Sequence, residues 1–163
     1  MIIEIACIIT NGELDQVYEG PNIIIQQDAK TMESMNDWCV DHHGKSGLTA
    51  QVLASSVSLA QAESAVLAFI KEHCEHKQGI LAGNSVYVDR QFLRREMPLI
   101  DDYLHYRIVD VSTIKELAKR WYPQTRAPAK QLSHRALDDI KESIAELRFY
   151  RNAIFQPRLS TPQ

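Results

Sequence analysis

The stretch MIIEIACIITNGELDQVYEGPNIIIQQ, residues 1–27, decides the fold. Its first part, IIEIACIIT (residues 2–10), is short, rich in β-branched residues and too apolar for an exposed strand. Asn11-Gly12 follows, and this dipeptide between two such runs is the strongest short-range signal for a β-hairpin. ELDQVYEG (13–20) and, after Pro21, NIIIQQ (22–27) supply the second and third runs. The sequence therefore predicts an antiparallel meander at the start of the chain.

Beyond this meander, helical and strand-like segments alternate. Met32, Met35 and Cys39 recur at helical spacing up to a break at DHHGKSG (41–47). Ser58 and Gln61 form a capping box at the start of the helix SLAQAESAVLAFIKEHC (58–74). The remaining expected elements are a short buried strand and turn in GILAGNSVYVD (79–89), a helix in RQFLRREMP (90–98), a strand in YRIVDV (106–111), and a helix in IKELAKRWY (114–122) capped by Thr113 with Glu116.

The last third of the chain reads as a loop, a helix and a tail. PQTRAPAKQL (123–132) has two prolines and is expected to be mobile, and apolar residues at spacings of three and four then predict a helix. QPRLSTPQ (156–163) reads as a flexible tail, so residues 1–155 form the single predicted domain. Antiparallel strands first, then alternating strands and helices, predict an α/β fold with a mixed sheet.

Composition narrows the class of protein. A chain of 163 residues with 45% hydrophobic and 24% charged residues is expected to be one globular domain without a membrane span. Three widely spaced cysteines and no signal peptide favour a reducing, intracellular compartment. A net charge of −3 argues against gripping long nucleic acid by its phosphates alone. A short anionic substrate is compatible with this net charge if metal ions supply the positive charge at the site.

The segment SHRALDDIKESI, residues 133–144, places an imidazole and two carboxylates at the front of the last helix. Asp138 and Asp139 are favoured there by the helix dipole whatever they do. The functional interpretation is that His134 is a catalytic base beside a metal-binding carboxylate. Helix geometry slightly favours Asp138 as the partner of His134, because residues four apart share a face.

Two further carboxylates follow predicted strands. Asp89 ends AGNSVYVD, at a place where α/β folds present functional groups, although a helix cap there is also expected. Asp110 lies inside RIVDVST, with Ser112 and Thr113 at the next helix start. Hydroxyl and backbone N–H groups at that point suit a phosphate, and capping alone explains them equally well.

Four blocks in unbroken order resemble the oligoribonuclease family of DEDD-type 3′-to-5′ exoribonucleases: WCVDHHGKSGL (38–48), AGNSVYVD (82–89), LHYRIVDVSTIKELAKRWYP (104–123) and SHRALDDIKESIAELRFYR (133–151). The resemblance runs from Ile2 to about Phe155. It implies a ribonuclease H-like mixed sheet flanked by helices, and a homodimer that degrades very short RNAs, dinucleotides above all, to mononucleotides. It also implies two divalent ions, Mg²⁺ or Mn²⁺, held by four acidic residues, with a histidine as general base.

Carried over by this resemblance, the third acid is Asp89, the fourth is Asp139 and the base is His134, which overrules the preference for Asp138. The resemblance also implies a set of substrate-binding residues: Trp38 for the nucleobase, His43 on the substrate side, Ser85, Arg107 and Ser112 for the 5′ phosphate, and Tyr106 as the tyrosine that one subunit offers to the active site of the other. Stacking on an aromatic face tolerates any base, and an Arg fork suits a terminal phosphate.

The family pattern also requires a block of the form W-x-D-x-E-x-T-G-L before IIEIA, which supplies the first strand and the first two acids. Here the sequence passes from Met1 directly into IIEIACIIT, and Glu4 matches a position in the family's second strand. The expectation is a shortened form that lacks the first strand, leaves strand edges open and is poorly active or inactive. The alternative function is then an impaired form that retains dimerisation and binds short RNA through Trp38, Arg107 and Ser112.

Two other site classes are weaker. DHH (41–43) is the signature triplet of another phosphoesterase class, but here it follows a helix-like segment and no Gly-Gly-His segment follows. HCEH (73–76) offers three candidate zinc ligands at a helix end, where a solvated terminus is the simpler interpretation. The compartment stays open between cytoplasm and mitochondria, since members of the family occur in both.

Overall fold

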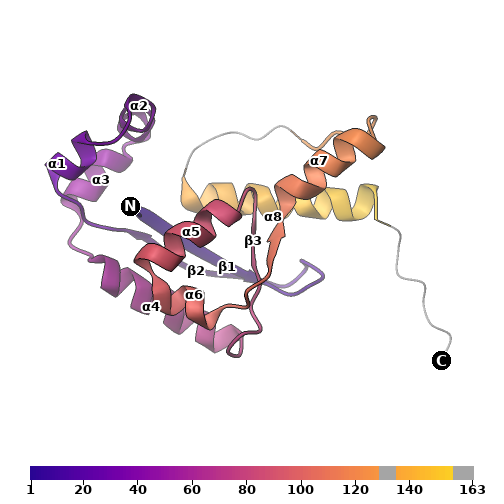
Figure 1. Ribbon diagram of the computed structural model, residues 1–163, viewed down its shortest axis with the longest axis horizontal. Helices are drawn as coiled ribbons and strands as arrows, with labels where there is room; N and C mark the ends of the chain where they lie inside the picture. The colour runs from indigo at the N-terminus through magenta and orange to yellow at the C-terminus, as the bar shows by residue number, and fades with distance from the viewer. Residues whose placement is uncertain (129–134, 156–163) are drawn as a thin grey trace.

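The computed structural model describes residues 1–128 and 135–155, which form two strand pairs surrounded by helices (Figure 1). His134, most of the predicted mobile loop's second half and the predicted tail lie outside the described residues. The elements in chain order are β1 (Glu4–Thr10), β2 (Val17–Ile24), α1 (Ala29–Glu33), α2 (Asp37–Lys45), α3 (Leu48–Ala54), α4 (Leu59–His73), β3 (Leu81–Gly83), α5 (Tyr87–Glu96), α6 (Pro98–Tyr103), β4 (Ile108–Asp110), α7 (Val111–Trp121) and α8 (Ala136–Ala153).

The opening of the chain is a two-stranded hairpin, so the predicted three-stranded meander is wrong. β2 continues through Pro21, and the second and third predicted runs are one strand. The register explains how: Ala6 pairs with Asn22 and Ile8 with Glu19, so Gly20 and Pro21 together oppose Cys7 in a β-bulge. A bulge leaves a residue without a ladder hydrogen bond, which suits proline because it has no N–H to donate.

The two faces of β1 contact different helices. Ile5, Cys7 and Ile9 pack against the main core cluster, which α4, α5 and α6 supply from their buried faces. Glu4, on the opposite face, contacts Arg135 at the start of α8. A strand covered on both faces reads as a continuous apolar run rather than an alternating one, and this accounts for the composition of IIEIACIIT.

The predicted α/β class with flanking helices is confirmed. β1 and β2 pair antiparallel, and β3 and β4 pair parallel, as two separate two-stranded sheets within the described chain. α1, α2 and α3 form a group at one end of the molecule, and α7 lies at the other end (Figure 1). No single helix of residues 1–128 and 135–155 is long and apolar enough to cross a membrane; α3 and α4, which meet at a 103° bend, reach that length and composition only as a pair.

The capping and break patterns read from the sequence predicted some helix boundaries correctly and others incorrectly. The capping box of Ser58 and Gln61 is present at the start of α4. The break expected at DHHGKSG lies at the end of that segment, because α2 continues through Lys45 and Gly47 then adopts the left-handed conformation. The cap of α7 is Asp110 rather than Thr113, since the Asp110 side chain accepts a hydrogen bond from Ser112 N.

The buried Glu63 side chain of α4 ties α6 to the core. Its Oε1 accepts a hydrogen bond from the backbone N of Leu99 at 2.7 Å and a longer one from that of Ile100 at 3.4 Å. These are N–H groups of the first turn of α6, which have no partner within their own helix. Glu63 is therefore a capping residue supplied by another helix.

We expect Glu63→Ala to lower the free energy of unfolding by about 1–3 kcal/mol, because two N–H donors of α6, the buried one of Ile100 and the partly buried one of Leu99, lose their acceptor. Glu63→Gln is the matched control: it keeps an acceptor oxygen and should retain most of the stability. Urea unfolding followed by circular dichroism measures both. Equal losses in the two variants would show that the charge, rather than the capping of α6, stabilises this contact.

Candidate functional site

Asp89 lies in the first turn of α5, at the rim of a groove bordered by β1 and β3. α5 begins at Tyr87, so Asp89 is inside the helix rather than its cap, and the Asp89 side chain is exposed. Partial desolvation raises the pKa of Asp89, and the nearby Asp110 carboxylate raises it further. Asp89 therefore holds its proton more tightly than an ordinary aspartate does. A bound cation would stabilise its ionised form.

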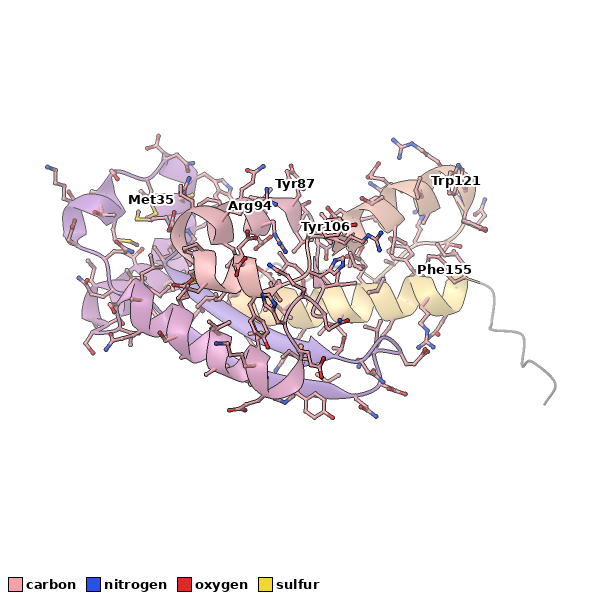
Figure 2. The ribbon with its side chains drawn as sticks, turned by 60° about the horizontal axis from the view of Figure 1, so that its bottom comes forward. Met35, Tyr87, Arg94, Tyr106, Trp121 and Phe155 are labelled. Carbon is pink, nitrogen blue, oxygen red and sulfur yellow. The ribbon has the colours of Figure 1, made fainter. Side chains whose placement is uncertain are left out.

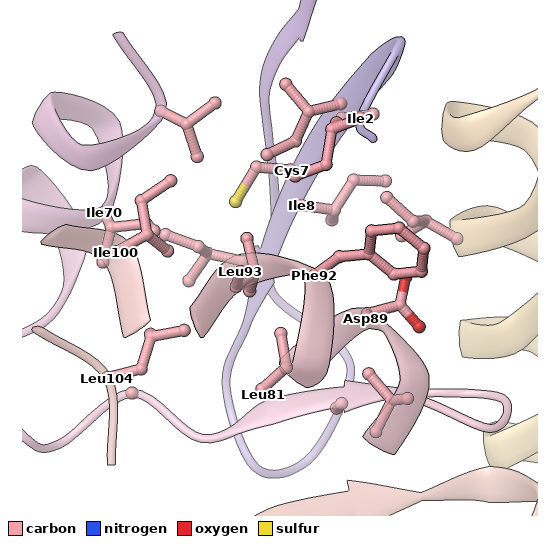
Figure 3. A pocket seen from close by; sticks show the side chains of 18 of the residues that line it. Ile2, Cys7, Ile8, Ile70, Leu81, Asp89, Phe92, Leu93, Ile100 and Leu104 are labelled. Atoms are coloured by element: carbon pink, nitrogen blue, oxygen red, sulfur yellow. The ribbon is translucent and has the colours of Figure 1, made fainter. Parts of the chain in front are cut away.

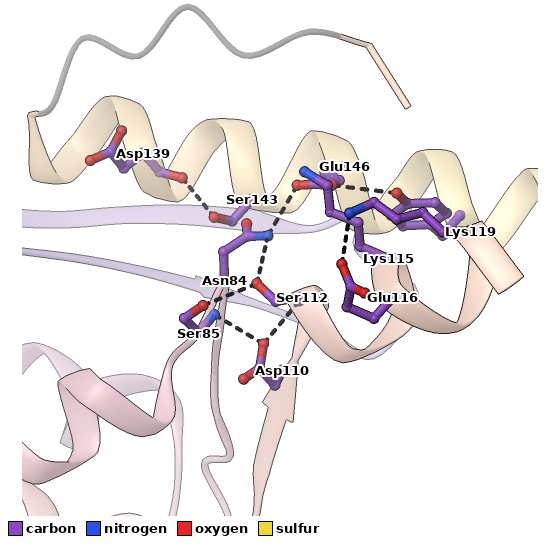
Figure 4. Close-up of polar contacts among 11 residues, drawn as sticks. Asn84, Ser85, Asp110, Ser112, Lys115, Glu116, Lys119, Asp139, Ser143 and Glu146 are labelled. Atoms are coloured by element: carbon purple, nitrogen blue, oxygen red, sulfur yellow. Dashed lines mark hydrogen bonds and ion pairs between the residues drawn. The ribbon is translucent and has the colours of Figure 1, made fainter. Parts of the chain in front are cut away.

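Asp139 lies in the first turn of α8 beside Asp138. Its backbone carbonyl accepts a hydrogen bond from Ser143 Oγ at 2.7 Å (Figure 4). Ile140, the next residue, lines the same groove as Asp89, whose side chain is labelled in Figure 3. The predicted metal-binding carboxylates therefore lie in the first turns of two helices that border one groove.

The start of α8 is held in place by Glu4 of β1. Arg135 donates to Glu4 Oε1 from Nη2 at 2.9 Å and from Nε at 3.1 Å, and Ala136 N donates to Glu4 Oε2 at 3.2 Å. The Glu4 side chain is only 5% exposed, so this is a desolvated ion pair. It fixes the residue that directly follows His134 in the chain, although His134 itself lies outside the described residues.

Ser85 and Ser112, two of the predicted phosphate-binding residues, are brought together where β3 and β4 end. Their hydroxyl oxygens are 3.3 Å apart, and Asp110 Oδ1 accepts hydrogen bonds from the backbone N of both residues at 2.9 Å (Figure 4). Ser85 has a φ of 53°, an uncommon conformation for a residue with a side chain. Because Asp110 occupies these N–H groups, only the hydroxyls remain for a phosphate.

A second polar layer joins this pair of serines to α8. Asn84 Nδ2 donates to Ser112 Oγ at 3.4 Å and to Glu146 Oε2 at 3.0 Å, and Lys115 Nζ lies 3.4 Å from Glu146 Oε1 (Figure 4). Glu146 is 5% exposed; burial of Tyr150, and then the nearby charge of Glu146, raise the pKa of the Tyr150 hydroxyl. The serine pair is thus connected to the buried Glu146 through a partly buried network.

Trp38 and His43 both lie on α2, away from the serine pair. The Trp38 ring is 55% exposed and stacks on His42, with ring centroids 4.0 Å apart. α2 belongs to the end of the molecule opposite α7 (Figure 1). The described chain thus presents an exposed aromatic face, as stacking requires, but does not place it beside Ser85 and Ser112.

Tyr106 and Arg107 lie in the segment between α6 and β4. Tyr106, labelled in Figure 2, is 69% exposed. The Arg107 guanidinium lies over the Tyr106 ring, 5.4 Å from its centroid. The guanidinium is therefore supported on one face by an aromatic ring, with its N–H donors still able to reach an anion.

The donor chemistry of Asp89 and Asp139 fits a hard divalent cation, because carboxylate oxygens are the ligands such ions prefer. The described parts of the chain contain no group of three or more His, Cys, Asp or Glu side chains arranged to hold a metal ion. The HCEH segment (73–76) belongs to these described parts, so the geometry gives the zinc alternative no support.

Comparison with known proteins decides the family. The family model for Exonuclease matches residues 1–147. The chain is 54% identical over 159 residues to "Oligoribonuclease, mitochondrial" of Mus musculus, covering 96% of this chain and 67% of that protein. It is 50% identical to "Probable oligoribonuclease" of Dictyostelium discoideum, covering 96% and 82%, and 49% identical to "Oligoribonuclease" of Colwellia psychrerythraea, covering 96% and 87%.

The chain belongs to the oligoribonuclease family. The predicted resemblance is confirmed, and by family the chain is an enzyme, a 3′-to-5′ exoribonuclease of short RNA. The exonuclease family is dependent on divalent metal ions. The DHH phosphoesterase alternative is excluded by this membership.

Two oligoribonuclease residues in the site were missed or misjudged from the sequence. Glu4 was set aside as a metal ligand and given no other role, although a lone carboxylate inside an apolar strand signals a buried ion pair. Glu146 was not singled out in the sequence, but it is the buried acceptor for Asn84. Nothing local identifies its partners, because they are 62 and 31 positions away in the chain.

We expect Glu4→Ala to destabilise the protein by about 3–5 kcal/mol, because the change leaves the Arg135 guanidinium and Ala136 N without their acceptor. Glu19→Ala is the matched control, since Glu19 also joins the hairpin to α8 through an ion pair with Lys141 at 3.0 Å, but an exposed one. Its loss should be below about 1 kcal/mol. If Glu4→Ala and Glu19→Ala have the same denaturant midpoint, the assigned role of Glu4 is wrong.

The raised pKa of Asp89 makes a signed prediction about pH. A carboxyl group whose pKa is higher in the folded state binds its proton more tightly there, so stability falls as pH rises through that pKa. Asp89→Asn should therefore stabilise the protein at neutral pH and have little effect at acidic pH below the usual aspartate range. Urea midpoints at the two pH values measure this. If Asp89→Asn stabilises the protein equally at neutral and at acidic pH, the titration of Asp89 is not the cause of the stabilisation.

Proposed function

We propose that this chain hydrolyses RNA dinucleotides from the 3′ end with Mg²⁺ or Mn²⁺ held by Asp89 and Asp139. The observation that carries this proposal is that both carboxylates lie in first helical turns beside one groove, in a member of an exoribonuclease family. A bound pair of divalent ions supplies stabilisation of the attacking and leaving oxygens in phosphodiester hydrolysis.

Asp89 and Asp139 contribute oxygen donors and neutralise the ions. The raised pKa of Asp89 means that its carboxylate is poorly stabilised by the protein alone. Binding of a cation reverses that balance, because the cation favours the ionised form. Metal binding should therefore release a proton where the free Asp89 is still protonated, and should weaken as pH falls.

His134 is proposed as the general base that takes a proton from the attacking water. A neutral imidazole suits this step because its ordinary pKa lies close to neutral pH. The clamp of Glu4 on Arg135 and Ala136 supports the assignment, since it gives the adjacent backbone a fixed anchor.

The substrate is proposed to bind through stacking and phosphate contacts. Trp38 offers an exposed face for a base, and His43 on the same helix contributes on the substrate side. Arg107 supplies the positive charge that a 5′ phosphate needs, with the Ser85 and Ser112 hydroxyls as neutral donors. This division follows from Asp110, whose carboxylate already accepts the N–H groups of both serines.

The association state and compartment belong to the same proposal. We infer a homodimer in which the exposed Tyr106 of one subunit reaches the site of the other, a geometry that would bring together groups that lie apart in one chain. We also propose residues 1–155 as one domain acting inside the cell. The mammalian relatives are named mitochondrial and the bacterial one is not, so the chain's own compartment is left between cytoplasm and mitochondria.

A second candidate function is binding of short RNA without turnover. The absence of a metal-binding group of three side chains from the described residues favours it, because two carboxylates hold Mg²⁺ weakly. Trp38, Arg107 and Ser112 would bind the dinucleotide in this case without a metal.

The deciding experiment is hydrolysis of a 5′-phosphorylated RNA dinucleotide by the 163-residue chain with Mg²⁺ or Mn²⁺, beside His134→Ala. The proposal expects turnover that falls by about 10²–10⁴-fold in His134→Ala, the usual contribution of a general base. No turnover, with dinucleotide binding that survives a chelator, would establish the binding function instead.

Arg107→Ala separates substrate handling from chemistry. If Arg107 binds the 5′ phosphate equally in ground and transition states, its loss raises KM and leaves kcat unchanged. The matched substrate is the same dinucleotide with a 5′ hydroxyl, for which Arg107→Ala should have no effect. A fall in kcat on both substrates would place Arg107 in a different role.

A further inference from the structure

The segment between α6 and β4 carries consecutive side chains that contact one another, those of His105, Tyr106 and Arg107. The His105 ring stacks on the Tyr106 ring, with the ring centroids 4.6 Å apart and the ring planes inclined by 26°. The Arg107 guanidinium lies over the same Tyr106 ring, 5.4 Å from its centroid. The backbone N of Arg107 donates a hydrogen bond to His105 Nδ1 at 3.1 Å. His105 is therefore linked to Arg107 both directly, through the backbone, and indirectly, through Tyr106.

These links matter because Tyr106 and Arg107 are both exposed side chains. Within residues 1–128 and 135–155, the ring contacts of Tyr106 are those with His105 and Arg107. A long side chain on a protein surface samples many rotamers, and binding a ligand costs the entropy of fixing one of them. A contact that restricts this motion before the ligand arrives therefore raises the affinity.

His105 can restrict its neighbours because its own backbone is held on both sides. His105 N donates to Gly79 O at 2.8 Å, and His105 O accepts a hydrogen bond from Arg90 Nη1 at 2.9 Å. Arg90 is only 7% exposed, and its Nε forms an ion pair with Asp101. Separating a buried ion pair leaves desolvated charges without a partner, so this anchor resists movement. His105 is thus a half-buried, anchored residue whose side chain contacts two exposed ones.

We propose that His105 is a positioning residue for the contact between Arg107 and the 5′ phosphate. Its Nδ1 fixes the backbone of Arg107, and its ring supports Tyr106, on which the Arg107 guanidinium lies. The inference rests on the proposed function in one respect, that Arg107 binds the 5′ phosphate. His105 is assigned no contact with the substrate, so its effect on binding comes through Arg107.

A positioning role and a merely structural role of His105 differ in what they do to substrate preference. Loss of a structural contact weakens binding of every dinucleotide to the same extent. Loss of positioning through Arg107 weakens binding only of a dinucleotide that carries the 5′ phosphate. The quantity to measure is the 5′-phosphate preference, defined as the Kd of the 5′-hydroxyl dinucleotide divided by the Kd of the 5′-phosphorylated one.

Three substitutions of His105 separate its two contacts. His105→Ala removes both and should lower the 5′-phosphate preference by about three- to tenfold, the effect of losing the preorganisation of one long side chain. His105→Asn loses the ring but keeps an acceptor, because an asparagine side chain accepts a hydrogen bond from the backbone N–H two residues on. His105→Phe keeps a ring against Tyr106 and loses the acceptor. Both conservative variants should retain more of the preference than His105→Ala.

The probe is an RNA dinucleotide in which a methylene group replaces the bridging 3′ oxygen, so that it binds without being cleaved. It is made with a 5′ phosphate and with a 5′ hydroxyl, and calorimetric titration of the 163-residue chain with Mg²⁺ present gives both Kd values. His76→Phe is the matched control. The His76 ring also lies against a tyrosine, with its centroid 5.2 Å from that of Tyr103, but this pair lies outside the contacts that lead to Arg107. This substitution should leave the preference unchanged.

A second measurement tests the hydrogen bond of His105 without any RNA. Hydrogen exchange of the Arg107 amide, followed by NMR, reports whether its N–H is bonded. Exchange should be faster in His105→Ala and His105→Phe than in the unchanged chain, and His105→Asn should restore the slower rate.

The inference is overturned if His105→Ala leaves the preference unchanged, if it weakens both dinucleotides equally, or if Arg107 exchanges at one rate in all these proteins. Arg107→Ala identifies a failure of the proposed function. If Arg107→Ala leaves the preference unchanged, or if the chain binds neither probe, the phosphate role of Arg107 is wrong and the inference falls with it. If Arg107→Ala abolishes the preference and His105→Ala does not alter it, only the inference about His105 is wrong.

Discussion

β1 has two apolar faces, and the arrangement of the whole chain follows from covering both. Ile5, Cys7 and Ile9 on one face require the buried side of α4, with α5 and α6 behind it. The other face requires α8, the last helix of the chain, which returns across more than a hundred residues to reach it. Neither helix is stabilised mainly by its own propensity, because each forms against a surface that β1 presents.

α8 is tied to the hairpin at both ends, and this makes it a firm support for the site. At its start, Glu4 holds Arg135 and Ala136. Near its end, Arg148 Nε donates to Leu14 O at 2.8 Å, in the loop of the hairpin. A helix fixed at two points cannot slide along the strand without breaking a buried ion pair, so the position of Asp139 is set by the hairpin.

Features governed by neighbouring residues were predictable from the sequence, and features governed by distant ones were not. The capping box of α4 needs only Ser58 and Gln61, and it was placed correctly. The bulge at Gly20 and Pro21 depends on the partner strand, so proline was read as a boundary instead. Asp89 and Asp139 were found through the family blocks, whereas nothing near Glu4 in the sequence identifies its partner Arg135, which is 131 positions away.

The candidate binding groups and the candidate metal ligands lie on different elements, and this makes binding and chemistry separable in the fold. Trp38 is carried by α2, and Ser85 and Ser112 are held by Asp110 where β3 and β4 end. The carboxylates are carried by α5 and α8, whose positions depend on the core and on the hairpin. Changes at the rim of the groove would alter the surroundings of Asp89 through desolvation, which already dominates its pKa, while leaving the serine pair intact.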